Sequence, residues 1–225
     1  MLNTVHYDGP GDTVPLLIAH GLFGSARNWG VLAKRFSERR PVIVVDMRNH
    51  GQSPWHDTQS YHDMAADLAE VMDRPCDVLG HSMGGKAAMV LALQEPAKVN
   101  RLIVGDIAPI TYTHSQMGPI EAMRGVDLTA IESRADAKAQ LGDLEPGVPD
   151  FLLQSLDMKT REWRLNLDVL AAEMDKIIGF PDVSGTYSGS TLFLSGAASD
   201  YVQRDARPAI KAMFPGAKFA KIPGA

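Results

Sequence analysis

The sequence is poor in the features that mark several classes of protein. Its 225 residues include one cysteine, Cys76, which excludes an internal disulfide and a cysteine-rich metal site. The chain has 22 basic and 27 acidic residues, a net charge of −5, and its longest basic runs are pairs such as Arg39-Arg40. This balance predicts neither a nucleic-acid partner nor binding to an anionic membrane.

Long apolar runs are also missing. No stretch approaches the roughly 20 residues that a membrane-spanning helix needs. Residues 1–9 lack the basic and then apolar pattern of a signal peptide. We therefore expect a cytoplasmic protein with no membrane span. Because 45% of its residues are hydrophobic, a chain of this length can bury a core without disulfides or a structural metal.

Short apolar runs alternate along the chain with longer amphipathic stretches. This alternation is typical of a parallel sheet covered by helices, the α/β class. Most runs are continuously apolar, which predicts burial on both faces of the sheet. Strands are predicted at 15–19, 41–46, 76–80, 102–105, 191–194 and 218–222, and helices at 26–38 and 86–94.

The stretch 111–189 has a different character. It is helix-like, mixed in polarity, broken by glycines and prolines, and free of strand-like runs. We interpret it as a helical cap inserted into a core made of residues 1–110 and 190–225, and name it the cap segment. Ordinary crossover helices are the alternative, but roughly 75 residues exceed the 10–15 or so that one crossover helix needs.

The run Gly80-His81-Ser82-Met83-Gly84 contains the pattern Gly-x-Ser-x-Gly between a predicted strand and a predicted helix. A serine at such a sharp turn projects its hydroxyl above the sheet, and the glycines avoid collisions with the neighbouring strand and helix. The helix N-terminus also favours developing negative charge. These features predict Ser82 as a nucleophile rather than an incidental serine in a glycine turn.

A second glycine-bearing loop, His20-Gly21-Leu22-Phe23-Gly24, follows the first predicted strand. Acyl transfer needs two backbone N–H groups aimed at the oxyanion. We predict the N–H of Met83 as one donor and that of Leu22 or Phe23 as the other. His20 and His50 are expected to support their loops by hydrogen bonding rather than to act as the base.

Four motifs in this order carry a resemblance to a known group of proteins. The chain resembles the small α/β-hydrolase esterases of the YbfF-like group and their mitochondrial relatives, and the resemblance spans nearly its whole length. The motifs are His20-Gly21-x-Phe23-Gly24, Asp46-x-Arg48-Asn49-His50-Gly51-x-Ser53, Gly80-His81-Ser82-Met83-Gly84-Gly85 and Asp106-Ile107-Ala108-Pro109.

The resemblance implies an α/β-hydrolase fold with a helical cap that shapes an acyl pocket. It also implies hydrolysis of small-molecule carboxylic esters by a Ser-His-Asp triad, without a metal or organic cofactor. For the acid there are two candidates, Asp106 and Asp200, because either could follow a strand end near the histidine. We favour Asp106, the position that the YbfF-like group implies.

The base has no candidate among the histidines of the chain. The resemblance places it in a Gly-His-aromatic turn just after the last strand, so we expect it just beyond Ala225. The closing helix usual in the family is also missing from the expected elements of this sequence. We favour a sequence that stops before the natural C-terminus over a naturally truncated protein.

Two other functions fit the same residues. One is a cofactor-free haloperoxidase-like or carbon–carbon bond hydrolase, because the fold does not determine the substrate. The other is a non-catalytic, hydrolase-like receptor, which a chain that truly ended at Ala225 would favour.

Overall fold

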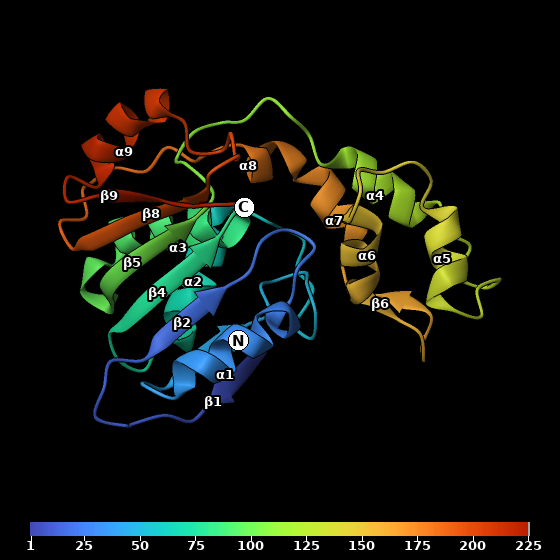
Figure 1. Ribbon diagram of the computed structural model, residues 1–225, viewed down its shortest axis with the longest axis horizontal. Helices are drawn as coiled ribbons and strands as arrows, with labels where there is room; N and C mark the ends of the chain where they lie inside the picture. The colour runs from blue at the N-terminus through green and yellow to red at the C-terminus, as the bar shows by residue number, and fades with distance from the viewer. Residues whose placement is uncertain (225) are drawn as a thin grey trace.

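In this computed structural model, residues 1–224 are described, and they form a seven-stranded sheet between helices (Figure 1). The strand order is β1-β3-β2-β4-β5-β8-β9, and every neighbouring pair is parallel except β1 and β3. The mostly parallel sheet is as predicted. The strands are β1 (Thr4–Tyr7), β2 (Leu16–Ala19), β3 (Val42–Val45), β4 (Cys76–His81), β5 (Val99–Gly105), β8 (Ser190–Gly196) and β9 (Lys218–Ile222).

All six predicted strands are present, and β9 has the predicted bounds. The edge strand β1 is not among the predictions, because its half-exposed residues form no apolar run. Burial on both faces holds for β2 and β3, whose residues are all buried. On β5 and β8 the prediction of burial on both faces is wrong for one face, where Ile103 and Leu192 are only half-buried.

Side chains that alternate along each strand separate two layers of core. On β2, Leu17 and Ala19 join the larger cluster, whereas Leu16 and Ile18 face the smaller one. Helices α2 (Tyr61–Val71), α3 (Met83–Gln94) and α9 (Arg207–Met213) cover the first face, and α1 (Gly30–Ser37) covers part of the second. Short 3-10 turns accompany them at η1 (Ala26–Trp29), η2 (Pro96–Lys98) and η4 (Arg204–Ala206).

The helices differ in detail from the prediction. The stretch 26–38 divides into η1 and α1, and α3 begins at Met83 rather than at residue 86. Helix α2 is not among the predictions; its start is fixed by Ser60, whose side chain accepts a hydrogen bond from the N–H of Asp63. The longest helix described, α3, has 12 residues, and no helix within residues 1–224 has the length and hydrophobicity needed to cross a membrane.

The cap segment stands beside the sheet, to the right in Figure 1. Its elements are α4 (Met117–Arg124), α5 (Arg134–Gln140), α6 (Val148–Leu152), η3 (Leu153–Ser155), β6 (Leu156–Asp157), β7 (Glu162–Trp163), α7 (Leu167–Ala172) and α8 (Met174–Ile178). The prediction of a segment without strands is wrong at β6 and β7, which pair antiparallel as a hairpin. These helices share a hydrophobic cluster, to which Phe23 is the one buried residue described that the rest of the chain contributes. The division into a core domain and a cap domain stays a prediction.

The parallel strands bring several loops to one edge of the sheet. The carboxyl ends of β2, β4, β5 and β8 lie side by side, so the residues that follow them meet there. Gly21 follows β2, Ser82 follows β4 and Asp106 follows β5. In α/β sheets this edge is where ligands bind.

The turn between β4 and α3 depends on glycine. A Cβ on Gly84 would lie 2.5 Å from the carbonyl oxygens of Ala19 and His20. A Cβ on Gly80 would lie 2.2 Å from the carbonyl oxygen of Gly84. Helix α3 can therefore lie this close to the end of β2 and to β4 only because Gly84 and Gly80 lack a side chain.

We predict that Gly84→Ala lowers the free energy of unfolding by about 3 kcal/mol or more, because the clashing atoms are backbone. Gly118→Ala, in α4, is the control, since a Cβ there meets nothing within 4 Å. It should stabilise the protein by about 0.5–1 kcal/mol through the helix propensity of alanine. Urea unfolding of both variants measures the two changes, and an equal effect would contradict the packing argument.

Candidate active site

Ser82 lies at the sharp turn between β4 and α3. Its backbone has φ 49° and ψ −118°, a strained conformation for a residue with a side chain. The N–H of Ser82 donates to the carbonyl of Gly105 at 2.9 Å, which ties the turn to the end of β5. Ser82 borders a cavity of about 480 Å³. The turn therefore presents the hydroxyl to a space large enough for a small ligand.

The glycine loop after β2 lies against this turn. A Cβ on Gly21 would be 3.2 Å from the Cβ of Ser82. Within residues 1–224 the N–H groups of Leu22 and Met83 donate to no backbone or side-chain acceptor. The N–H of Phe23 is already engaged, because it donates to Nε2 of His50 at 3.2 Å. Leu22 and Phe23 are the two donors that the sequence predicts for this loop. Of the two, it is the N–H of Leu22 that has no acceptor among residues 1–224.

Two buried histidines, His20 and His50, form hydrogen bonds to the loop of Gly21. Nδ1 of His20 donates to the carbonyl of Gly21 at 2.7 Å, and its Nε2 accepts from the N–H of Met47 at 2.9 Å. Nδ1 of His50 donates to the carbonyl of Arg48 at 2.8 Å. Burial lowers the pKa of His20 to about 4 and that of His50 to about 3. Both rings are neutral with both nitrogens occupied, so neither is available as a general base.

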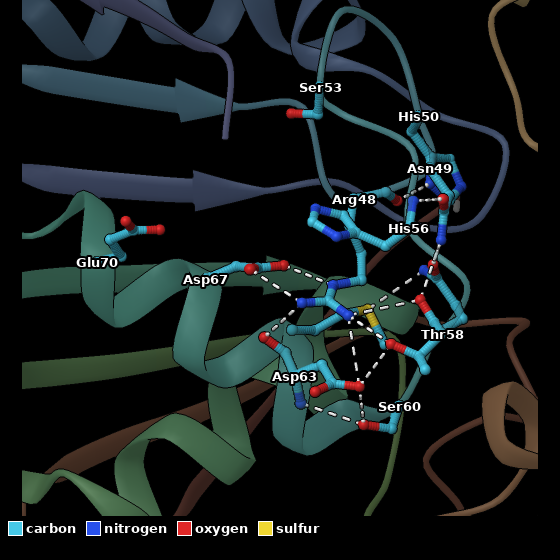
Figure 2. Close-up of polar contacts among 12 residues, drawn as sticks. Arg48, Asn49, His50, Ser53, His56, Thr58, Ser60, Asp63, Asp67 and Glu70 are labelled. Carbon is cyan, nitrogen blue, oxygen red and sulfur yellow. Dashed lines mark hydrogen bonds and ion pairs between the residues drawn. The ribbon is translucent and has the colours of Figure 1, made fainter. Parts of the chain in front are cut away.

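The loop that carries His50 is anchored on α2 through Arg48 (Figure 2). The guanidinium of Arg48 forms two hydrogen bonds with the carboxylate of Asp67, at 2.6 and 3.0 Å, and a third with Oγ1 of Thr58 at 2.8 Å. The side-chain amide of Asn49 donates to the carbonyl of Thr58 at 3.1 Å. The bidentate pair gives this loop a fixed orientation and thereby positions His50.

The structure separates the two candidate acids. Asp106 directly follows β5, with φ 54°, and its N–H donates to the carbonyl of Leu194 at 2.7 Å. Its Oδ1 is buried without a hydrogen-bond partner among residues 1–224. Asp200 is exposed, in the loop beyond β8. A buried carboxylate oxygen without a partner is costly unless another group satisfies it. Asp106 is therefore consistent with a role in the site, whereas Asp200 is consistent with a solvated side chain.

No described histidine is hydrogen-bonded to Ser82 within residues 1–224. His81 and His114 border the cavity. Loss of solvation lowers the pKa of His81, and the negative charge of Asp106 opposes this shift. Strand β9 pairs parallel with β8 as far as Ile222, so it ends at the same edge of the sheet. The histidine expected beyond Ala225 lies outside the described residues.

Lys86 is a residue of the site that the sequence reasoning missed. It lies one helical turn after Ser82, borders the cavity and is almost fully buried. Its ammonium group donates to the carbonyls of Ile178 and Gly179, at 2.8 and 2.5 Å, and lies 4.8 Å from the centre of the Tyr112 ring. Burial lowers its pKa to about 7. A single lysine within the otherwise apolar run of α3 is the signal that could have identified it.

Comparison with known proteins identifies the family of the chain. A model of the alpha/beta hydrolase family matches residues 16–225, and the chain belongs to this family. It is 43% identical over 234 residues to the Mus musculus protein named sn-1-specific diacylglycerol lipase ABHD11. This alignment covers 97% of this chain and 76% of that protein. It is 36% identical over 218 residues to Escherichia coli esterase YbfF, covering 94% and 85%.

A solved structure described as a marine microorganism esterase matches with a TM-score of 0.93 at 35% identity, covering 100% of this chain and 91% of that chain. The fold is therefore the α/β-hydrolase fold, as predicted. The resemblance to the YbfF-like esterases is likewise confirmed.

We predict that Lys86→Met removes a pH dependence of stability. The folded-state pKa of Lys86, about 7, lies below its unfolded value of 10.5. Between these values the unfolded chain binds more protons, so the stability of the wild type rises with pH. Relative to Lys86→Met, the wild type should gain about 2 kcal/mol between pH 7 and pH 9. Urea unfolding at the two pH values measures this difference, and a constant difference would contradict the assignment.

Proposed function

We propose that the protein is a serine carboxylesterase that hydrolyses small-molecule acyl esters through an acyl-enzyme on Ser82. The observation that carries this proposal is the strained turn at Ser82 with the loop of Gly21 packed against it. Relatives named esterase and lipase support ester hydrolysis as the reaction. The mostly apolar residues around the cavity, among them Trp29, Phe151 and Ile177, suit an acyl chain.

The first chemical step is attack by the Ser82 hydroxyl on the ester carbonyl. A histidine following β9, the base implied by the resemblance, takes the proton from the hydroxyl and passes it to the leaving alcohol. The N–H groups of Leu22 and Met83 stabilise the tetrahedral oxyanion. Water activated by the same histidine then releases the acid and restores Ser82. Apart from the ester and this water, every proposed step uses groups of the protein.

The proposed triad acid is Asp106. Its unsatisfied Oδ1 provides an acceptor for the far nitrogen of the histidine, which would fix the tautomer of the ring and stabilise the imidazolium. Asp200 is too exposed for this role. The proposed location is the cytoplasm, the expectation from the sequence.

The first test uses protein expressed from the full gene. With p-nitrophenyl esters from acetate to octanoate, Ser82→Ala should lower kcat at least about 10⁴-fold, because no other group can form the acyl-enzyme. Initial rates at saturating ester measure the loss. Equal rates for wild type and Ser82→Ala would overturn the proposed function.

The second test distinguishes the two acids. Asp106→Asn should lower kcat by about 10³-fold or more, because the amide no longer stabilises the imidazolium. Asp200→Asn, the matched control, should stay within about twofold of wild type, since a solvated side chain away from the chemistry has little effect. The same ester assay measures both, and the reverse order of effects would assign the role to Asp200.

A further inference from the structure

Phe23 is held at both of its peptide groups. Its N–H donates to His50, and its carbonyl oxygen accepts a hydrogen bond from the hydroxyl of Ser155 at 2.8 Å. Its φ of 63° is in the left-handed region, which a bulky residue adopts only when its surroundings enforce it. The two hydrogen bonds thus maintain a conformation that determines where the preceding residue, Leu22, directs its N–H.

The side chain of Phe23 packs among residues of the cap segment rather than in the clusters that cover the sheet. It is buried in the hydrophobic cluster formed by the cap helices, with Ile120, Leu152 and Trp163 among its members. All the other buried residues that the structure describes in this cluster come from the cap segment. Through this packing, Phe23 joins the loop beside Ser82 to the cap segment.

The β6–β7 hairpin connects the two supports of Phe23. Ser155 directly precedes β6, and its carbonyl accepts from the N–H of Arg164, which directly follows β7. The carbonyl of Arg164 in turn accepts from the N–H of Gly51 at 2.8 Å. The N–H of Asn166 donates to the carbonyl of Asn49 at 3.0 Å. The hairpin thus bonds to the loop of His50, drawn in Figure 2, as well as to Phe23.

We propose that the β6–β7 hairpin positions the oxyanion donor Leu22 through Phe23, with Ser155 as the positioning residue on the cap side and His50 on the core side. The proposal rests on the proposed function, because it assigns a role within the same ester hydrolysis. The docking of the cap segment sets the geometry that stabilises the transition state, in addition to enclosing the cavity.

The test compares Ser155→Ala with Ser155→Thr, which keeps a hydroxyl. Loss of an oxyanion donor costs roughly 10²–10³ in kcat, so misplacing one should lower kcat about tenfold in Ser155→Ala. KM should change by less than about twofold, because the donor acts on the transition state. Ser155→Thr should recover most of the rate. Each kcat is normalised to the fraction of protein that a fluorophosphonate titrates.

A second readout separates positioning from a general structural effect. A trifluoromethyl ketone adds to the serine and forms a tetrahedral oxyanion. Its inhibition constant should rise about tenfold in Ser155→Ala, in parallel with the fall in kcat. Gln154→Ala is the matched control. It removes a neighbouring hydrogen bond between cap segment and core, from Asn28 to Gln154 at 2.6 Å, and neither hydrogen bond of Phe23 involves Gln154. It should leave both values within about twofold of wild type.

The outcomes distinguish this proposal from the proposed function. An inactive Ser82→Ala together with an unchanged kcat and inhibition constant in Ser155→Ala would overturn the positioning role alone. Equal losses in Ser155→Ala and Gln154→Ala would also overturn it, since general loosening of the cap segment would then explain both. An active Ser82→Ala would instead remove the proposed function on which the proposal rests.

Discussion

The site depends on one backbone constraint, the strained, positive-φ conformation of Ser82 between β4 and α3. At φ 49° a serine is strained, and the turn persists because its surroundings hold it there. The N–H of Ser82 is bonded to Gly105, and Gly80 and Gly84 allow the chain to pass within van der Waals distance of itself and of β2. The same turn places Met83 at the wall of the cavity, and Lys86 lies at that wall one helical turn later.

The remaining half of the site is built from contacts between distant segments. His20 and His50 must be neutral to support the loop of Gly21, because a protonated ring could not accept a hydrogen bond from a backbone N–H. Burial supplies this neutrality by lowering the pKa values of His20 and His50 far below their usual range. The Arg48–Asp67 pair fixes one of these rings from α2, and the β6–β7 hairpin fixes the same loop from the cap segment. The loop of Gly21, the loop of His50 and the cap segment are therefore joined in one hydrogen-bond network.

Much of this could be predicted from the sequence, because the signals are local. The strands appear as apolar runs, and the nucleophile turn needs glycines at two specific positions next to Ser82. Asp106 and Asp200 could not be separated in this way, because each follows a parallel strand that ends at the same edge. Their difference in burial comes from the loops that cover them, which no local pattern reports.

Contacts between residues far apart in the chain could not be predicted from the sequence either. The choice between Leu22 and Phe23 depends on an acceptor 27 residues away, His50. The hydroxyl of Ser155 and the carbonyl of Phe23 are 132 residues apart, and the two-residue strands β6 and β7 are too short to show a period. Such features emerge only when the cap segment is packed on the core.

The central claim is that Ser82 is the activated nucleophile of this protein. It is tested most directly by reacting protein from the full gene with a fluorophosphonate, followed by intact-mass measurement and peptide mapping. The account predicts one phosphonyl adduct, located on Ser82 and absent from Ser82→Ala. No adduct on the wild type, or an adduct that persists in Ser82→Ala, would contradict it.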